Sequence, residues 1–185
     1  MRGDDGVEEP HPSVVAAARR GEQGAFEQLV RIYQADIWRL CHHLLGNPSA
    51  ADDATQEAFL RAYRFVPKFK GGSKFSTWLF SIARHCCLDE MRRVGRVRRL
   101  SEAVKAQPER APPRSEAGLE VREAVCGLAM ELREPLVMID VLGLSYAEVG
   151  EALRLPVGTV KSRVHRARSE LADALGDYLG RSNEA

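Results

Sequence analysis

Apolar side chains recur at helical spacing near the N-terminus, and this pattern constrains the fold more than any other feature. Between Phe26 and Leu44 they lie three or four residues apart, on one face of a long helix. A Gly-Asn-Pro sequence at 46–48 predicts the end of that helix. The same spacing predicts another helix over 76–94, and no segment alternates like a strand. We therefore expect an all-α fold.

A further helix is predicted between these two, running to about Arg64. Ser49 followed by Asp52 resembles a capping box, with Asp in place of the usual Glu or Gln, and Pro67 ends the segment. One face of this helix is a polar stripe with a single exposed leucine. Taken alone, such a stripe indicates an ordinary solvated face. The stripe consists of Asp53, Gln56, Glu57, Leu60 and Arg64.

Composition divides the chain into two small helical domains joined by a flexible linker. Prolines among charged and small residues follow the third predicted helix, and such a linker can hold two modules apart on a shared partner. The N-terminus is acidic and has nothing to bury, so we expect it to be mobile. The expected parts are an acidic flexible tail at 1–13, a module at 14–96, the linker at 97–120, a module at 121–178 and a tail at 179–185.

The second module contains a capped helix, a tight turn and another helix. Ser145 and Glu148 form a capping box at the start of the first helix. In the second helix, apolar residues between Val160 and Leu171 share one face, and the opposite face is polar. Residues 161–168 contain four basic side chains and no acidic one. This arrangement is typical of a helix-turn-helix that enters the major groove of DNA, although periodicity alone leaves an ordinary helical hairpin open.

The string GLSYAEVGEALRLPVGTVKSRVHRARSEL at 143–171 closely resembles the promoter-binding C-terminal module of the extracytoplasmic-function (ECF) sigma factors of bacterial RNA polymerase. The resemblance implies that this module reads the minus-thirty-five element and contacts the flap of the second-largest polymerase subunit. Arginine and lysine suit guanine edges and phosphates, and serine and histidine can reach bases or backbone. The residues assigned to the minus-thirty-five element are Thr159, Lys161, Ser162, Arg163, His165 and Arg166.

The string SAADDATQEAFLRAYRFVPKFKGGSKFSTWLFSIARHCCLDEMRR at 49–93 is similar to the N-terminal module of the same family. In that family this module binds core RNA polymerase, recognises the minus-ten element and helps to melt the promoter. The polar stripe then resembles the surface that docks on the clamp helices of the largest subunit, with Leu60 as an apolar anchor. The residues assigned to polymerase binding are Asp53, Gln56, Glu57, Leu60, Arg61 and Arg64.

Aromatic residues and lysines are interleaved between the second and third helices, as in proteins that capture single-stranded nucleic acid. Phe75 and Trp78 fit the apolar face of the third helix and are expected in the core. Phe69 fits no helix face and is the best candidate for a ring that contacts a flipped base, which the resemblance also implies. The residues assigned to the minus-ten element are Phe69, Lys70, Lys74, His85, Arg92 and Arg96.

Two positions depart from the family pattern. His85 stands where Asn is common, so the preferred minus-ten base is expected to differ. Ile139 stands where a phosphate-contacting Arg is common, so one backbone contact is expected to be missing. Asp89 lies one helical turn before Arg93 and is expected to form an intrahelical pair with it.

The net charge of +1 would by itself argue against DNA binding. It is the sum of unlike parts, because the first nine residues are acidic and residues 84–99 hold six arginines against two carboxylates. A modest overall charge fits a protein whose DNA affinity is completed by a larger partner. We hypothesise that the acidic tail shields a basic surface.

No cofactor or metal site is indicated. The four cysteines form no CxxC pair and are expected to be small apolar residues in a reducing environment, without disulfides. The apolar stretch near the N-terminus is too short for a signal peptide or a membrane span, so we expect a cytoplasmic bacterial protein without membrane insertion. The cysteines are Cys41, Cys86, Cys87 and Cys126.

The primary interpretation is a non-enzymatic sigma factor that directs promoter-specific transcription initiation. Its expected partners are core RNA polymerase, promoter DNA and an anti-sigma factor. The alternative is a free-standing repressor or activator that uses only the helix-turn-helix and binds duplex DNA unaided, as a dimer. An enzyme is a distant third, because no Gly-rich phosphate loop, HExxH or nucleophile motif is present.

Overall fold

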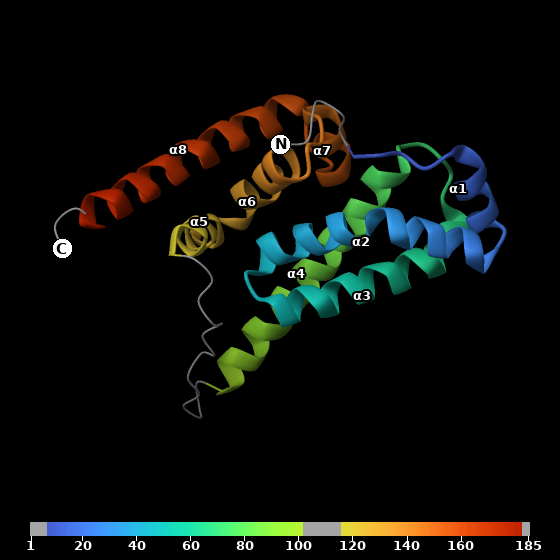
Figure 1. The fold of residues 1–185 in the computed structure, drawn as a ribbon, viewed down its shortest axis with the longest axis horizontal. Helices are drawn as coiled ribbons and strands as arrows, with labels where there is room; N and C mark the ends of the chain where they lie inside the picture. The colour runs from blue at the N-terminus through green and yellow to red at the C-terminus, as the bar shows by residue number, and fades with distance from the viewer. Residues whose placement is uncertain (1–6, 102–115, 183–185) are drawn as a thin grey trace.

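A computed structural model describes residues 7–101 and 116–182, with side chains omitted at 96–101, 116–120 and 177–182. Every regular element in this part of the chain is helical, as predicted (Figure 1). The N-terminal module consists of α1 (Pro12–Arg19), α2 (Gln23–Leu45), α3 (Pro48–Phe65), a 3₁₀ turn η1 (Val66–Lys68) and α4 (Phe75–Ser101). The C-terminal module consists of α5 (Glu116–Gly127), α6 (Met130–Leu136), a π-helical turn η2 (Val137–Val141), α7 (Tyr146–Leu153) and α8 (Val157–Ser182).

The end of α2 and the start of α3 depend on three consecutive residues. Gly46 has a φ of 71° and donates its N–H to the carbonyl of His42 at 2.8 Å, which ends α2 where predicted. Asn47 caps α3 by accepting from the N–H of Ala50 at 3.0 Å. The predicted capping box from Ser49 to Asp52 is therefore wrong. The Asp52 carboxylate instead accepts from the indole N–H of Trp38, at 2.7 Å.

The buried face of α3 is made of alanines. All four are at most 4% exposed, so the backbone of α3 can lie close to both α2 and α4. Larger side chains from those two helices fill the remaining volume of the core, and Tyr33 and Phe80 are the largest. Because alanine faces inward, the long polar side chains of α3 are left on its outer face. The alanines are Ala51, Ala54, Ala58 and Ala62.

Two segments expected to be flexible contain ordered structure. Helix α4 continues to Ser101 and α5 begins at Glu116, so helices enter the predicted linker from both sides, and residues 102–115 lie outside the described residues. In the predicted tail, residues 7–11 (the N-terminal strap) lie on the N-terminal module, and Pro10 is buried. Helix α1 then begins at Pro12. The expectation of a mobile tail is wrong for residues 7–13, while residues 1–6 lie outside the described part.

The predicted helix-turn-helix is present. Ser145 and Glu148 form the capping box of α7 in full. Gly150 allows the turn to close, because a Cβ there would lie 2.9 Å from the carbonyl oxygen of Leu155. Arg154 ends α7 in the left-handed conformation, with a φ of 55°. The apolar face of α8 is buried at Val160, Val164 and Ala167.

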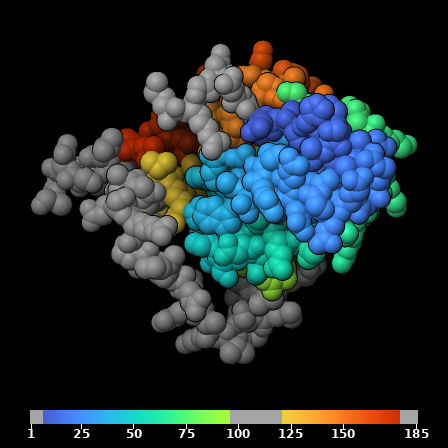
Figure 2. All heavy atoms as spheres, turned by 45° about the vertical axis from the view of Figure 1, so that its right-hand side comes forward, coloured from blue at the N-terminus to red at the C-terminus, as the bar shows by residue number. Residues whose placement is uncertain are grey.

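The two modules pack against one another (Figures 1 and 2). Their buried apolar residues form one continuous core. Arg133 of α6 is 8% exposed and donates to three backbone carbonyls, those of Leu44 in α2 at 2.7 Å, Leu128 at 2.9 Å and Cys126. Burial lowers the pKa of Arg133. A Cβ at Gly46 would lie 2.7 Å from the sulfur of Cys126, so glycine also allows α5 to approach the end of α2.

A buried ion pair reinforces this contact. Glu134 of α6 is 3% exposed and accepts from the guanidinium of Arg84 in α4 at 2.8 Å. In this structure the two modules are closed on one another. All four cysteines are free thiols, and three of them are buried, as expected of small apolar residues.

Candidate polymerase and nucleic-acid interfaces

The basic face of α8 is open to solvent. The capped α7, the tight turn at Gly150 and the buried valines of α8 together fix which side of α8 faces outward. Lys161, Ser162, His165 and Arg166 are exposed on this side, and Thr159 and Arg163 are partly buried. The structure therefore brings the six residues predicted for the minus-thirty-five element together on the outward side of one helix.

The arginines of this face have exposed acidic neighbours. Arg166 pairs with Glu170 at 2.9 Å, one turn further along α8. Arg163 lies 3.8 Å from Glu131 of α6. Such exposed pairs contribute little to stability, so these arginines can exchange a carboxylate for a phosphate at small cost.

Two residues of this surface were not predicted. Tyr146 of α7 lies beneath Lys161, whose ammonium is 5.8 Å from the centre of the ring. Arg168 makes two hydrogen bonds to Asp140 at 2.6 and 3.1 Å, which raise the pKa of Arg168 and tie α8 to η2. With Ser169 and His165 these residues line a shallow pocket of about 530 Å³. Tyr146 belongs to the quoted motif, but only the fold shows that it reaches α8.

The outer face of α3 presents the residues predicted to bind polymerase. Asp53, Gln56, Leu60 and Arg64 are exposed, and Leu60 is 47% exposed despite being apolar. Beside them lies an apolar groove of about 560 Å³ between α2 and α3. The sequence interpretation did not identify the groove, because its aromatic rings come from two helices. It is lined by Phe26, Phe59, Leu60 and Tyr63, with Gln23, Glu27 and Gln56 at its rim.

Two of the six residues predicted to bind polymerase already have partners within the module. Arg61 donates to Glu57 at 2.6 Å and to Asp89 of α4 at 2.8 Å. Hydrogen bonds to Asp89 and Glu57 raise the pKa of Arg61, and the bond from Arg61 lowers the pKa of Asp89. The expected pair between Asp89 and Arg93 is wrong. Asp89 faces α3 instead, and Arg93 pairs with Glu90 at 2.6 Å.

Phe69 lies in the core rather than on the surface of its loop. It is 8% exposed and its ring centre lies 5.6 Å from that of Phe75 and 5.1 Å from that of Trp78. The expectation of a free ring is wrong, because three aromatic rings pack together beneath the loop. Phe75 is buried and Trp78 half-buried, as predicted.

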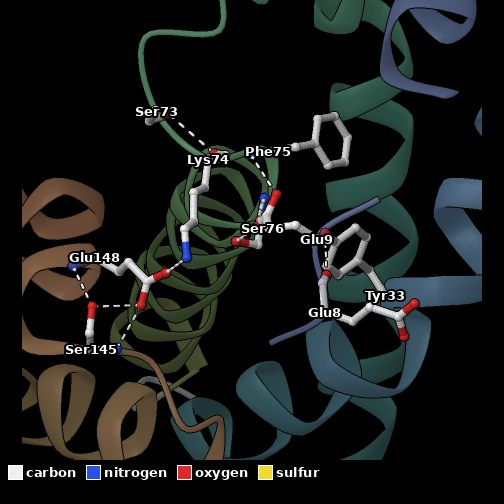
Figure 3. Close-up of polar contacts among 9 residues, drawn as sticks. All are labelled: Glu8, Glu9, Tyr33, Ser73, Lys74, Phe75, Ser76, Ser145 and Glu148. Atoms are coloured by element: carbon white, nitrogen blue, oxygen red, sulfur yellow. Dashed lines mark hydrogen bonds and ion pairs between the residues drawn. The ribbon is translucent and has the colours of Figure 1, made fainter. Parts of the chain in front are cut away.

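The remaining minus-ten residues occupy different surroundings. Lys70 and Arg92 are exposed, and Arg92 lies 3.4 Å from Asp89. Lys74 pairs with Glu148 of α7 at 2.7 Å (Figure 3). His85 is exposed, and its Nδ1–H donates to the carbonyl of Ser81 at 2.5 Å. The side chain of Arg96 lies outside the described residues.

His85 borders a pocket of about 240 Å³ between the two modules. One wall comes from Ser73 and from α4, including Trp78, Arg84 and His85, and the other wall comes from the end of α7 and Arg154. In the closed arrangement α7 therefore stands over this part of α4. Ile139, the other departure from the family pattern, packs against the core.

Comparison with known proteins covers both modules. Residues 29–97 match the family Sigma-70 region 2, and residues 118–171 match the family Sigma-70, region 4. The chain is 34% identical to the ECF RNA polymerase sigma factor SigW of Bacillus subtilis over 178 residues, covering 88% of this chain and 95% of SigW. It is 37% identical to SigC of Mycobacterium tuberculosis over 172 residues, covering 90% of this chain and 92% of SigC.

The chain spans less than two thirds of another relative. It is 36% identical to SigE of Mycolicibacterium smegmatis over 171 residues, covering 85% of this chain and 65% of SigE. Among solved structures, the sigma factor RpoE of Bartonella quintana, solved with the anti-sigma factor NepR, aligns with a TM-score of 0.71 and 27% identity over 82% of this chain and 96% of RpoE. CnrH, solved with the cytosolic domain of CnrY, aligns with a TM-score of 0.71 and 25% identity over 89% of this chain and 96% of CnrH.

Proposed function

The chain belongs to the extracytoplasmic-function sigma factors of the sigma-70 family, and on this premise we propose how its two modules divide promoter recognition. Sigma factors are transcription regulators rather than enzymes. They bind core RNA polymerase and direct promoter-specific initiation. The observation that carries the proposal is the exposed basic face of α8, which is held outward by a capped α7 and a buried apolar face.

The C-terminal module reads the minus-thirty-five element through α8. Arg166 and His165 are exposed at the middle of the outward face and are placed to reach base edges in the major groove. Lys161 and Thr159 lie nearer the start of α8, where the helix dipole favours phosphate. Tyr146 supports Lys161 from below.

The N-terminal module binds core polymerase through the outer face of α3. Leu60 and the adjoining groove expose apolar area to water. Covering this area with a helix of the polymerase would be favourable and would stabilise the complex. Asp53, Gln56 and Arg64 surround this surface and set the register of docking, Asp53 and Arg64 by charge and Gln56 by hydrogen bonding. Glu57 and Arg61 hold α3 to α4 and position the face.

The loop 66–74 and the adjoining part of α4 read the minus-ten element. Lys70 and Lys74 follow the DNA backbone, and His85 lies beside the base, with Arg92 and Arg96 along the flanking phosphates. The buried ring of Phe69 supports the loop from beneath and does not stack on DNA. No cofactor takes part in this proposal.

An anti-sigma protein is a further proposed partner. The support is that RpoE of Bartonella quintana, which shares the fold of this chain, was solved with its anti-sigma factor NepR. Because core polymerase and promoter DNA are the other partners, we place the protein in the bacterial cytoplasm. Within residues 7–101 and 116–182, no helix is long and apolar enough to cross a bilayer.

In vitro transcription with core polymerase and a promoter library tests the proposal. The wild-type chain is expected to give specific transcripts only with core polymerase and to report both promoter elements. A dimer that protects operator duplex unaided, without specific transcripts, would instead identify a free-standing regulator.

A pair of variants tests the docking surface. Asp53→Arg with Leu60→Ala is expected to abolish co-purification with core polymerase, because both the charge and the apolar anchor are lost. Asp173→Arg makes the same charge change on the exposed surface of α8 and is expected to leave core binding intact. Normal core binding by the first variant contradicts the assignment of α3.

A further inference from the structure

The first turn of α4 is capped by a side chain from the N-terminal strap. Its N-cap residue is Lys74, whose side chain cannot accept a hydrogen bond, so the free N–H groups of this turn need another acceptor. The carboxylate of Glu9 accepts from the N–H of Phe75 at 3.2 Å, from the N–H of Ser76 at 3.3 Å and from the Ser76 hydroxyl (Figure 3). An anion thus occupies the positive end of a 27-residue helix.

Packing and a second hydrogen bond hold the strap in place. Pro10 is buried, and Val7 packs against the core. The hydroxyl of Tyr33 donates to the backbone carbonyl of Glu8 at 2.8 Å. Burial and the nearby carboxylates of Glu9 and Glu8 raise the pKa of Tyr33, so its hydroxyl remains a donor. The side chain of Glu9 is therefore delivered to α4 by a seated segment.

A second carboxylate reaches the same place from the C-terminal module. Glu148 of α7 lies 2.7 Å from the ammonium of Lys74 and also accepts from the N–H and hydroxyl of Ser145, at 2.7 and 2.6 Å (Figure 3). Burial acts to raise the pKa of Glu148, but its hydrogen bonds from Lys74 and Ser145 outweigh this and lower it. Glu148 is thus charged while the modules are closed.

We infer that the N-terminal strap is an autoinhibitory element. Glu9 occupies the N–H groups of Phe75 and Ser76 and the Ser76 hydroxyl, which would otherwise face a promoter phosphate. Glu148 neutralises the neighbouring Lys74 from the C-terminal module. The inference rests on the proposed function of loop 66–74 and α4 in minus-ten recognition. A DNA strand is a polyanion that is attracted to the same helix terminus and the same lysine. The carboxylates of Glu9 and Glu148 must therefore leave before DNA can reach this helix terminus and Lys74.

Neutralising Glu9 tests the inference, and its neighbour provides a matched control. Glu8 contacts the module through its backbone carbonyl, so Glu8→Gln removes the same charge one residue away without releasing α4. Affinity of the free, full-length chain for a fluorescent oligothymidylate is measured by anisotropy at low salt. Glu9→Gln is expected to bind about 3- to 10-fold more tightly than wild type, the effect of one charge at a helix terminus. Glu8→Gln is expected to change affinity by less than about twofold.

Equal affinities of Glu9→Gln and Glu8→Gln, or weaker binding by Glu9→Gln, would show that Glu9 is only a structural cap and would overturn the inference. Thermal unfolding of both variants identifies any loss of folding. If Glu9→Gln does not fold, Tyr33→Phe removes the hydrogen bond to the carbonyl of Glu8 while all three donors at the start of α4 remain, and it is expected to tighten binding in the same direction.

Hydrogen exchange gives a second readout on the unaltered protein. Amides of residues 7–11 are expected to exchange faster in the holoenzyme bound to its promoter than in the free chain, because the strap has left α4. Unchanged or slower exchange there overturns the inference. Promoter-specific transcription by the wild-type holoenzyme tests the proposed function separately, so failure of the strap inference leaves the assignment of the two modules standing.

Discussion

The two surfaces proposed to contact DNA differ in what covers them. On α8, the basic side chains are open to solvent, and the carboxylates beside Arg163 and Arg166 are exposed and easily exchanged. At the start of α4, Glu9 and Glu148 occupy the donors from two directions, and α7 stands over the pocket beside His85. The basic face of α8 is thus available in the closed chain, whereas the start of α4 is available only after the strap and α7 have moved.

This difference suggests an order of events in initiation. A closed chain can meet duplex DNA through α8 without rearrangement. Lys74 loses its partner Glu148 only when the two modules separate, and binding to a large partner that holds both modules apart would drive that separation. The predictions below test this contrast between an open and a covered surface.

The largest effect is expected at Arg133, whose guanidinium joins the two modules. Arg133→Met is expected to lower the free energy of unfolding by about 5 kcal/mol, because three buried backbone carbonyls lose their donors. Urea unfolding measures this. Arg19→Met, on the exposed face of α1, is the control and should change stability by less than about 0.5 kcal/mol. A loss near that of the control would mean that Arg133 does not hold the closed form together.

Phe69 distinguishes a core ring from a ring that stacks on DNA. Phe69→Ala is expected to destabilise the chain by about 3 kcal/mol, as for loss of a buried aromatic side chain. Phe69→Leu keeps most of the apolar volume and is expected to retain both stability and promoter opening. Open-complex formation, measured by permanganate footprinting, checks the second point. Loss of opening in a stable Phe69→Leu variant would restore the ring to the DNA interface.

Arg166 tests the open surface alone. Arg166→Ala is expected to weaken holoenzyme binding at the minus-thirty-five element by about 2 kcal/mol, the contribution of a base-reading arginine, and to relax sequence preference there. Competition binding to a promoter library measures both. Arg20, an exposed arginine that pairs locally with Glu22, is the control, and Arg20→Ala should have no such effect. Unchanged selection by Arg166→Ala would remove this residue from base recognition.

The smallest effect is expected at Glu148, where acid should loosen the covered surface. The pKa of its carboxyl is lower in the folded chain than the ordinary value of 4.5, so its contribution is present above that pH and is lost as the pH falls through the folded pKa. Protonation releases Lys74. Because Lys74 is largely exposed, the loss should be below about 1 kcal/mol.

A pH series of urea unfolding on wild type and Glu148→Gln measures this contribution. The difference in stability between the two proteins is expected to shrink on acidification. A difference that is constant down to pH 3 would show that Glu148 does not titrate in the closed form.

The helices were predictable because they depend on local chemistry. The face from Phe26 to Leu44, the Gly46 stop and the capping box at Ser145 all require only residues close in sequence, and all three are present. The start of α3 was misassigned for a local reason as well, since Asn47 and Ser49 are both suitable caps and only Asn47 is used. The start of α4 shows the limit, because the cap of Phe75 lies 66 residues away at Glu9.

The candidate sites follow the same division. The six residues on α8 are neighbours in sequence on one side of a helix, and four of them are exposed in the structure. The apolar groove beside Leu60, the contact of Tyr146 with Lys161 and the pairing of Asp89 with Arg61 each join two helices, and periodicity within one helix contains no information about them. Phe69 was misplaced because a residue outside any helical face can still be buried by its neighbours.

The sequence by itself determined the family, the helical content and the outward face of α8, since these follow from motifs and from the 3.6-residue period. Only the tertiary structure decided which charged groups are free. Arg133, Arg84, Lys74 and the start of α4 all find partners far along the chain, and those partners are set by how the two modules close. Charge can be counted along a chain, but whether it is available to DNA depends on the carboxylates that folding brings beside it.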